Sequence, residues 1–240
     1  MKKIILIVLA AVFILSGCNK TADPKSTDVR SNGELSKDLV HSYTDYMDEV
    51  IRVNKEEEKT VLKVNDREIT NIAIDLEVLA DYESVKNSLS QIEEIYSTEE
   101  EKTEERKKYQ YKTKEEIIQK IIRNTVQEQE AERRGIESSY ENALEYAKES
   151  YNLLIEDMNN REEDKKMYED INKYIEEMGY SSIDEYLDEE AKVFMKLEMI
   201  TKLKSQVTES FSEKQKQNAE EEYEKFVDSL VKSAKIEYLE

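Results

Sequence analysis

The sequence predicts a mainly α-helical protein with one small β-hairpin that a strand at the C-terminus completes. Four glycines and one proline in 240 residues leave few turn-forming positions for an all-β or α/β fold. Apolar residues recur at helical spacing along most of the chain. The exceptions are VLKVNDREIT at 61–70 and AKIEYL at 234–239, where apolar and polar residues alternate as they do in half-buried strands.

The first residues have the pattern of a secreted lipoprotein signal. Two lysines precede an apolar run that is too short to span a bilayer comfortably, and small residues then lead to Cys18, the sole cysteine. The sequence LSGC at 15–18 resembles a bacterial lipobox. We therefore expect residues 1–17 to be a cleaved signal peptide and Cys18 to carry the lipid. The alternatives are an uncleaved short anchor and an ordinary signal peptide with a chance cysteine.

The residues after Cys18 are expected to separate the membrane from one folded domain. Residues 18–34 hold the only proline and a glycine among Ser, Thr, Asn and Asp, which is typical of a flexible tether. The helical domain is expected to span 35–240 and to begin with an amphipathic helix over 35–55. This arrangement predicts a lipid-anchored protein on the extracytoplasmic face of the cell membrane.

Helical spacing and capping signals predict the helices that follow the hairpin. Residues 72–96 are expected to form a helix, and the charged run at 97–112 to bend or fray. Later helices are expected to start at capping boxes, where a hydroxyl accepts from the third residue's amide and that residue's carboxylate reaches back. The predicted boxes are Thr113/Glu116, Ser138/Glu141, Ser182/Glu185 and Ser210/Glu213.

Two glycines are expected to end helices, and the helices are expected to share a thin core. Gly135 should stop the helix over 117–134, and Gly179 the helix over 167–178, each as a left-handed cap. Three helices carry apolar stripes that should face inward. The stripes are Ile117, Ile118, Ile121 and Ile122; Leu144, Ala147, Tyr151, Leu154 and Ile155; and Phe194, Leu197, Ile200 and Leu203.

The two strand-like stretches are expected to pair, although they lie far apart in the chain. Residues 61–64 and 68–70 should flank a turn at Asn65 and Asp66. An isolated hairpin is only marginally stable in water, so residues 235–239 should add a third strand. The end of the chain then closes against the start of the domain.

Three segments, in this order, resemble the chaperone domain of the SurA, PrsA and trigger-factor-like extracytoplasmic folding factors. They are Val64-Asn65 with Ile69-Thr70, then QEQEAERRGI at 127–136, then AKIEYL at 234–239. The resemblance covers roughly 61–240 and implies a helical chaperone-like domain. The family usually has glycine where Asp66 stands, so we expect some strain from a positive φ there. Many relatives also carry a parvulin isomerase domain, for which this chain has too few glycines and too little length.

The residue inventory offers little for catalysis. His41 is the sole histidine, and there is no Cys/His cluster for zinc and no calcium loop with its central glycine. We therefore expect no enzymatic activity, no cofactor and no metal. The net charge of −20 argues against nucleic acid and against docking on anionic lipid, so the membrane should be reached through the lipid anchor.

These expectations favour a membrane-anchored chaperone-like protein that binds unfolded or exported polypeptides and has no prolyl isomerase activity. Thioether and phenol side chains adapt to varied apolar clients, so the candidate client-binding residues are Met178, Tyr180, Tyr186, Met195 and Met199. The alternative is that these side chains fill the core. A second possible function is a structural or regulatory lipoprotein that docks one dedicated envelope partner.

Overall fold

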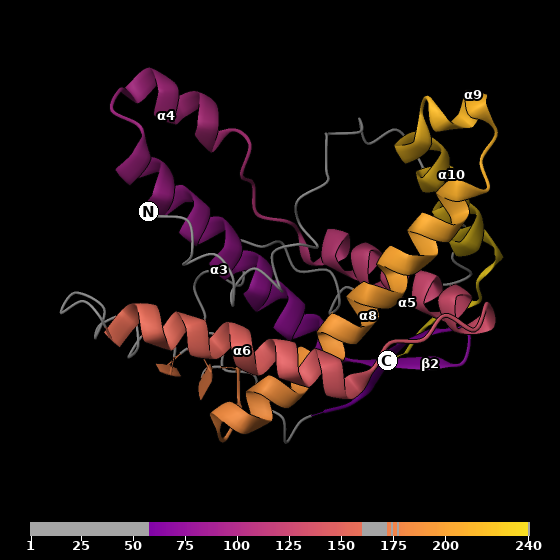
Figure 1. The fold of residues 1–240 in the computed structure, drawn as a ribbon, viewed down its shortest axis with the longest axis horizontal. Helices are drawn as coiled ribbons and strands as arrows, with labels where there is room; N and C mark the ends of the chain where they lie inside the picture. The colour runs from indigo at the N-terminus through magenta and orange to yellow at the C-terminus, as the bar shows by residue number, and fades with distance from the viewer. Residues whose placement is uncertain (1–57, 160–171, 174, 177, 240) are drawn as a thin grey trace.

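The computed structural model describes residues 58–159, 172–173, 175–176 and 178–239 (Figure 1). Several predicted features lie outside these residues: the signal peptide at 1–17, Cys18, the tether at 18–34, the helix at 35–55, His41 and most of the helix over 167–178. The side chains of Leu154 and Ile155 also lie outside the described set. The described part is mainly helical with one small sheet, as predicted.

The sheet has three antiparallel strands in the order β2-β1-β3. Strands β1 (Thr60–Val64) and β2 (Arg67–Thr70) form the hairpin, and β3 (Ile236–Tyr238) pairs with the other edge of β1. Leu62 of the central strand therefore lies opposite both Ile69 and Tyr238. The predicted hairpin and its completion by a C-terminal strand are confirmed.

The turn between β1 and β2 differs in one respect from the prediction. Val64 pairs with Arg67, so Asn65 and Asp66 form a two-residue loop. Among the described residues other than glycine, Asn65 has the positive φ, at 57°. The expectation of a positive φ at Asp66 is wrong, because this loop has its left-handed residue first, as type II′ turns do. Asparagine is one of the residues that tolerate this conformation best.

Seven helices are described with full bounds. They are α3 (Asn71–Ile95), α4 (Glu99–Arg106), α5 (Lys114–Arg133), α6 (Tyr140–Asn159), α8 (Ile183–Glu209), α9 (Glu213–Lys216) and α10 (Ala219–Ser233). Helix α3 follows β2 directly, with the Thr70 hydroxyl accepting from the Ala73 amide. The charged run at 97–112 does not simply fray, because Thr98 caps the short helix α4 within it.

Two of the predicted helix starts are confirmed, those of α5 and α8. The full capping box of Thr113 and Glu116 opens α5. The Ser182 hydroxyl accepts from the Glu185 amide and so caps α8. The Glu185 carboxylate reaches back one residue further than predicted, however, and accepts from the amide and hydroxyl of Ser181.

The other two predicted boxes are wrong, each because a different serine performs the capping. The Ser138 hydroxyl donates to Glu198 on α8, so Ser139 caps α6 instead and accepts from the Asn142 amide at 3.3 Å. Helix α8 continues to Glu209 because its apolar stripe continues, and Ser210 lies at its C-terminal end. The short helix α9 then begins after Ser212, whose amide and hydroxyl donate to Gln215.

Both predicted glycine caps are confirmed. Gly135 and Gly179 have φ values of 69° and 77°. In each case two backbone hydrogen bonds reach back over the last turn, as in a Schellman motif. At the end of α5 the Gly135 amide donates to Glu132 and the Ile136 amide donates to Ala131, which fixes the direction in which the chain leaves the helix.

Three apolar clusters hold the helices and the sheet together. The sheet core joins β1, β2, α3 and α5, and includes Leu62, Val64, Ile74, Ile117, Ile118 and Ile122. The α6–α8 core includes Ile72, Leu79, Ala147, Tyr151, Ile175, Met178, Tyr186 and Leu187. The α8–α10 core includes Ala131, Leu203, Val207, Tyr223 and Val227. The predicted stripe residues lie mainly at these contacts, so helix α8 contributes to two separate cores.

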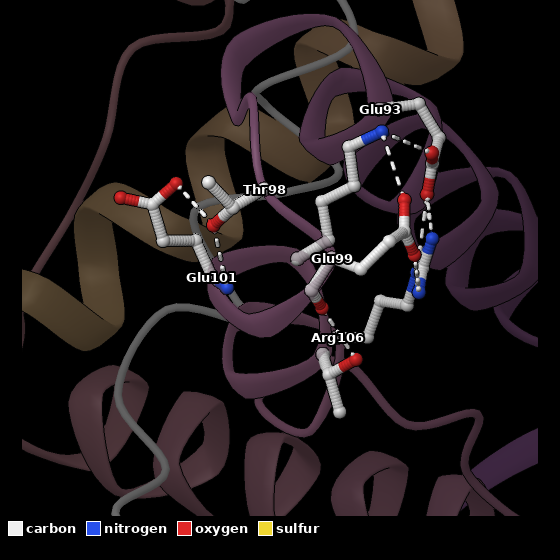
Figure 2. A network of polar contacts seen from close by, with 7 residues as sticks. Glu93, Thr98, Glu99, Glu101 and Arg106 are labelled. Carbon is white, nitrogen blue, oxygen red and sulfur yellow. Dashed lines mark hydrogen bonds and ion pairs between the residues drawn. The ribbon is translucent and has the colours of Figure 1, made fainter.

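Helices α3 and α4 form an arm that reaches away from the sheet (Figure 1). Ion pairs between the two helices hold the far end of the arm, because Lys102 and Arg106 of α4 both contact Glu93 of α3. Figure 2 shows Arg106 beside Glu93. Arg106 also lies 3.6 Å from Glu99. No residue of α4 is buried, so polar contacts rather than a core keep this helix against α3.

Candidate functional site

The three segments that carry the family resemblance meet at the side chain of Asn65. Its backbone amide donates to the Lys235 carbonyl at 2.7 Å, and its Oδ1 accepts from the Lys235 amide at 2.9 Å. Its Nδ2 donates to Gln129 Oε1 on α5 at 2.7 Å, and Gln129 Nε2 donates to the Val64 carbonyl at 3.0 Å. Asn65 therefore joins the hairpin, helix α5 and the C-terminal strand. We call this contact the Asn65 junction.

Arg67 strengthens the Asn65 junction from the other end of the turn. Its guanidinium donates to Glu128 at 2.6 Å and to Glu132 at 2.7 Å, both on α5. The Glu128 side chain is nearly buried, and burial raises its pKa while the nearby Lys196 and Arg67 oppose the shift. These contacts fix the hairpin to the last two turns of α5.

A second feature of interest is a small hollow between α6 and α8. It is lined by Ala147, Ser150, Leu187, Glu190 and Phe194. The hollow is too narrow to hold a water molecule, so its lining side chains lie against one another. We call it the α6–α8 hollow.

Large apolar side chains are exposed beside this hollow. Tyr146 and Leu153 are 51% and 54% exposed and lie two turns apart on one face of α6. The Tyr146 ring packs edge-on against Phe194 of α8, with ring centroids 4.9 Å apart. Tyr146 and Leu153 thus form an exposed apolar strip along α6, and Phe194 of α8 adjoins this strip at Tyr146. We call the surface formed by these three side chains the α6 face.

The hollow also contains a buried acid. Glu190 is 7% exposed and lies on the side of α8 that faces α6. Burial raises the pKa of its carboxyl to about 7, and a hydrogen bond with Tyr186 opposes the shift. A carboxyl in this position is mainly neutral below pH 7 and pays a desolvation cost when it ionises.

The structure places three of the five predicted client-binding residues in or against the α6–α8 core. Met178 and Tyr186 are 6% and 5% exposed, and Tyr180 packs edge-on against Tyr186 with ring centroids 5.7 Å apart. Met199 packs against the α8–α10 core instead, and Met195 is half-buried. Met178 and Tyr186 therefore have little surface to offer a client, and the five side chains do not form one site.

Sequence reasoning missed the α6 face and the acid beneath it. Tyr146 and Leu153 fall off the predicted inner stripe of α6, so their spacing indicated only an outer position. A signal for Glu190 was present: the charged residue interrupts an apolar stripe formed by Leu187, Ala191 and Phe194.

Among the residues that the structure describes, no group of three or more His, Cys, Asp or Glu side chains is arranged to hold a metal ion. None of the described helices has the length and apolar character needed to cross a membrane.

Comparisons with protein-family models, with curated proteins and with solved structures find no match.

Proposed function

We propose that the protein is a membrane-anchored, extracytoplasmic chaperone-like protein that holds unfolded or exported polypeptides and has no prolyl isomerase activity. The observation that carries this proposal is the Asn65 junction. Three segments separated by up to 170 positions resemble folding-factor chaperone domains in sequence, and Asn65 binds residues of the other two directly. Their meeting at one side chain supports a common structural unit rather than three chance matches.

The α6 face is the surface that we assign to clients. Tyr146 and Leu153 expose apolar area beside Phe194 on a protein whose net charge is −20. An apolar strip on a strongly acidic protein suits weak contact with extended chains, because apolar burial needs no fixed geometry and the net charge keeps the complex soluble.

An aggregation assay with matched variants tests this assignment. The protein should slow light scattering of a chemically unfolded protein in proportion to its own concentration. The double substitution Tyr146→Ser and Leu153→Ser should weaken this effect several-fold, because it removes most of the exposed apolar area of the α6 face. Tyr109→Ser is the control, since Tyr109 is 40% exposed and lies outside α6.

The same protein preparation tests the proposed absence of prolyl isomerase activity. The rate of a refolding step limited by proline isomerisation should not change when the protein is added. Acceleration of that step would contradict the absence of isomerase activity. No suppression of aggregation at several-fold molar excess would contradict client binding.

The alternative function is a structural or regulatory lipoprotein that docks one dedicated envelope partner. The exposed apolar residues of the α6 face are compatible with this role as well. Crosslinking in membranes followed by purification separates the two functions. Many substoichiometric polypeptides favour the chaperone-like function, whereas one stoichiometric and saturable partner favours the alternative.

A further inference from the structure

We propose that Glu190 makes the closure of α6 on α8 depend on pH: ionisation of its carboxyl loosens the contact and exposes the α6–α8 core. This regulation concerns client access and rests on the function proposed above. The closure itself is a property of the folded chain and is measured without any client.

The geometry supplies the reason for this dependence. Glu190 projects from α8 into the α6–α8 hollow, where α6 presents Ala147 and Ser150 and α8 itself presents Leu187 and Phe194. Glu190 is 7% exposed there, so little water can solvate a charge on its carboxyl. Separation of α6 from α8 would open the hollow to solvent and relieve the cost of ionisation.

Among the described residues, the lining of the α6–α8 hollow contains no cationic side chain that would pair with Glu190. The Tyr186 phenol on α8 hydrogen-bonds with the carboxyl, and the Tyr180 phenol lies close enough for Glu190 to contribute to its raised pKa. On α3, which also packs into this core, three described acids near its start form ion pairs with α5 or the residues just before it. These pairs are Asp75–Lys114, Glu77–Lys120 and Asp81–Lys112.

The core that would be exposed contains residues suited to apolar binding. Beneath the contact of α6 with α8 lie Tyr186, Met178 and Tyr151, each less than one tenth exposed in the closed structure. Opening would therefore extend the α6 face with further thioether and phenol side chains. Closure hides them, which gives Glu190 control over how much apolar surface the protein presents.

The direction of the effect follows from the raised pKa. Below pH 4.5, the ordinary value for a glutamate, the carboxyl is neutral in both the open and the closed state, so pH has no effect. Between that pH and about 7 the open state loses its proton first, and closure weakens as pH rises. From pH 5 to pH 8 the opening equilibrium should increase roughly 50- to 100-fold, at tenfold for each unit of pKa difference.

Amide hydrogen exchange on the full chain tests the proposal. Exchange rates in α6 are corrected for the intrinsic rates of unstructured peptides and compared with those in α5 at pH 5, 6, 7 and 8. The protection of α6 relative to α5 should fall as pH rises in the native protein. It should be nearly constant in Glu190→Gln, which keeps the side-chain shape without the charge.

Glu189→Gln is the matched control. It removes the same charge from the neighbouring position of α8, but the Glu189 side chain is 47% exposed and pairs with Lys192. The control should keep the native pH dependence. A constant ratio in the native protein, or the same fall in Glu190→Gln as in the native protein, would overturn the proposal. Circular dichroism at pH 5 checks that both variants are folded.

The aggregation assay at pH 5 and pH 8 separates this proposal from the proposed function. Suppression that is equal at both pH values in the native and Glu190→Gln proteins would overturn regulation by Glu190 and leave client binding standing. Absence of suppression at every pH, together with the predicted exchange behaviour, would overturn client binding and leave the pH-dependent closure standing.

Discussion

Replacement of Asn65 should destabilise the domain more than any change at the neighbouring turn residue. Asn65 has a φ of 57°, and its side chain makes hydrogen bonds of 2.7 Å to Gln129 and 2.9 Å to the Lys235 amide. Asn65→Ala removes both bonds and places a Cβ-bearing residue without a local polar contact in the left-handed region. Asn65→Gly removes the bonds but keeps the conformation accessible.

The two variants separate the two contributions. Each side-chain hydrogen bond contributes about 0.5–1.5 kcal/mol to stability, and the left-handed conformation costs an alanine about 1–2 kcal/mol. We therefore expect a loss of about 2–5 kcal/mol for Asn65→Ala and about 1–3 kcal/mol for Asn65→Gly. Asp66→Ala is the control and should cost about 0.5 kcal/mol or less, because its described contact is a 3.4 Å approach to Gln129.

Urea unfolding followed by circular dichroism measures these differences. A loss of about 3 kcal/mol is a large part of the 5–15 kcal/mol that holds a typical domain together, so the shift in midpoint should be obvious. The reasoning is refuted if Asn65→Ala and Asp66→Ala are equally stable. It is also refuted if Asn65→Gly is as destabilising as Asn65→Ala, since the backbone conformation would then contribute nothing.

Two further predictions concern the ends of the chain. Cys18→Ser should release the protein from membranes, because the proposed lipid anchor is lost. Its circular dichroism spectrum should stay unchanged, because the domain stays folded. Fatty-acid labelling that persists in this variant would contradict the lipidation site. Deletion of residues 235–240 removes two backbone hydrogen bonds, from Asn65 to Lys235 and from Leu239 to Val61. It also removes the partly buried side chains of Ile236 and Tyr238. The free energy of unfolding should therefore fall by about 2–4 kcal/mol. A truncated protein that melts at the native temperature would show that β3 contributes no stability.

The sheet and most helices were predictable because their signals are local. Alternation at 61–70 and 234–239 predicts strands, and the marginal stability of an isolated hairpin predicts that they pair. The glycine caps were equally accessible, since a left-handed residue after an apolar stripe fits Gly135 and Gly179. Each of these inferences needs only a few neighbouring residues.

Two of the wrong predictions involve choices that depend on distant residues. Ser138 and Ser139 are both suitable caps for α6, and the choice depends on Glu198 of α8, which accepts from the Ser138 hydroxyl. The residue that takes the left-handed conformation in the turn also depends on distant contacts. Asn65 and Asp66 both tolerate positive φ, but the Asn65 side chain has partners on α5 and at the end of the chain. Sequence spacing contains no information about such contacts.

The contact between α6 and α8 likewise could not be predicted from sequence spacing, and it decides which residues are available for binding. The side-chain chemistry of Met178 and Tyr186 left two expectations open, client binding or core filling, and the difference is whether another helix covers them. Here α6 covers them, and its contact with α8 contains the buried Glu190. A core built only for stability gains nothing from an acid whose ionisation weakens it. The free energy of separating α6 from α8, and not the sequence of either helix alone, therefore determines whether these residues are core or surface.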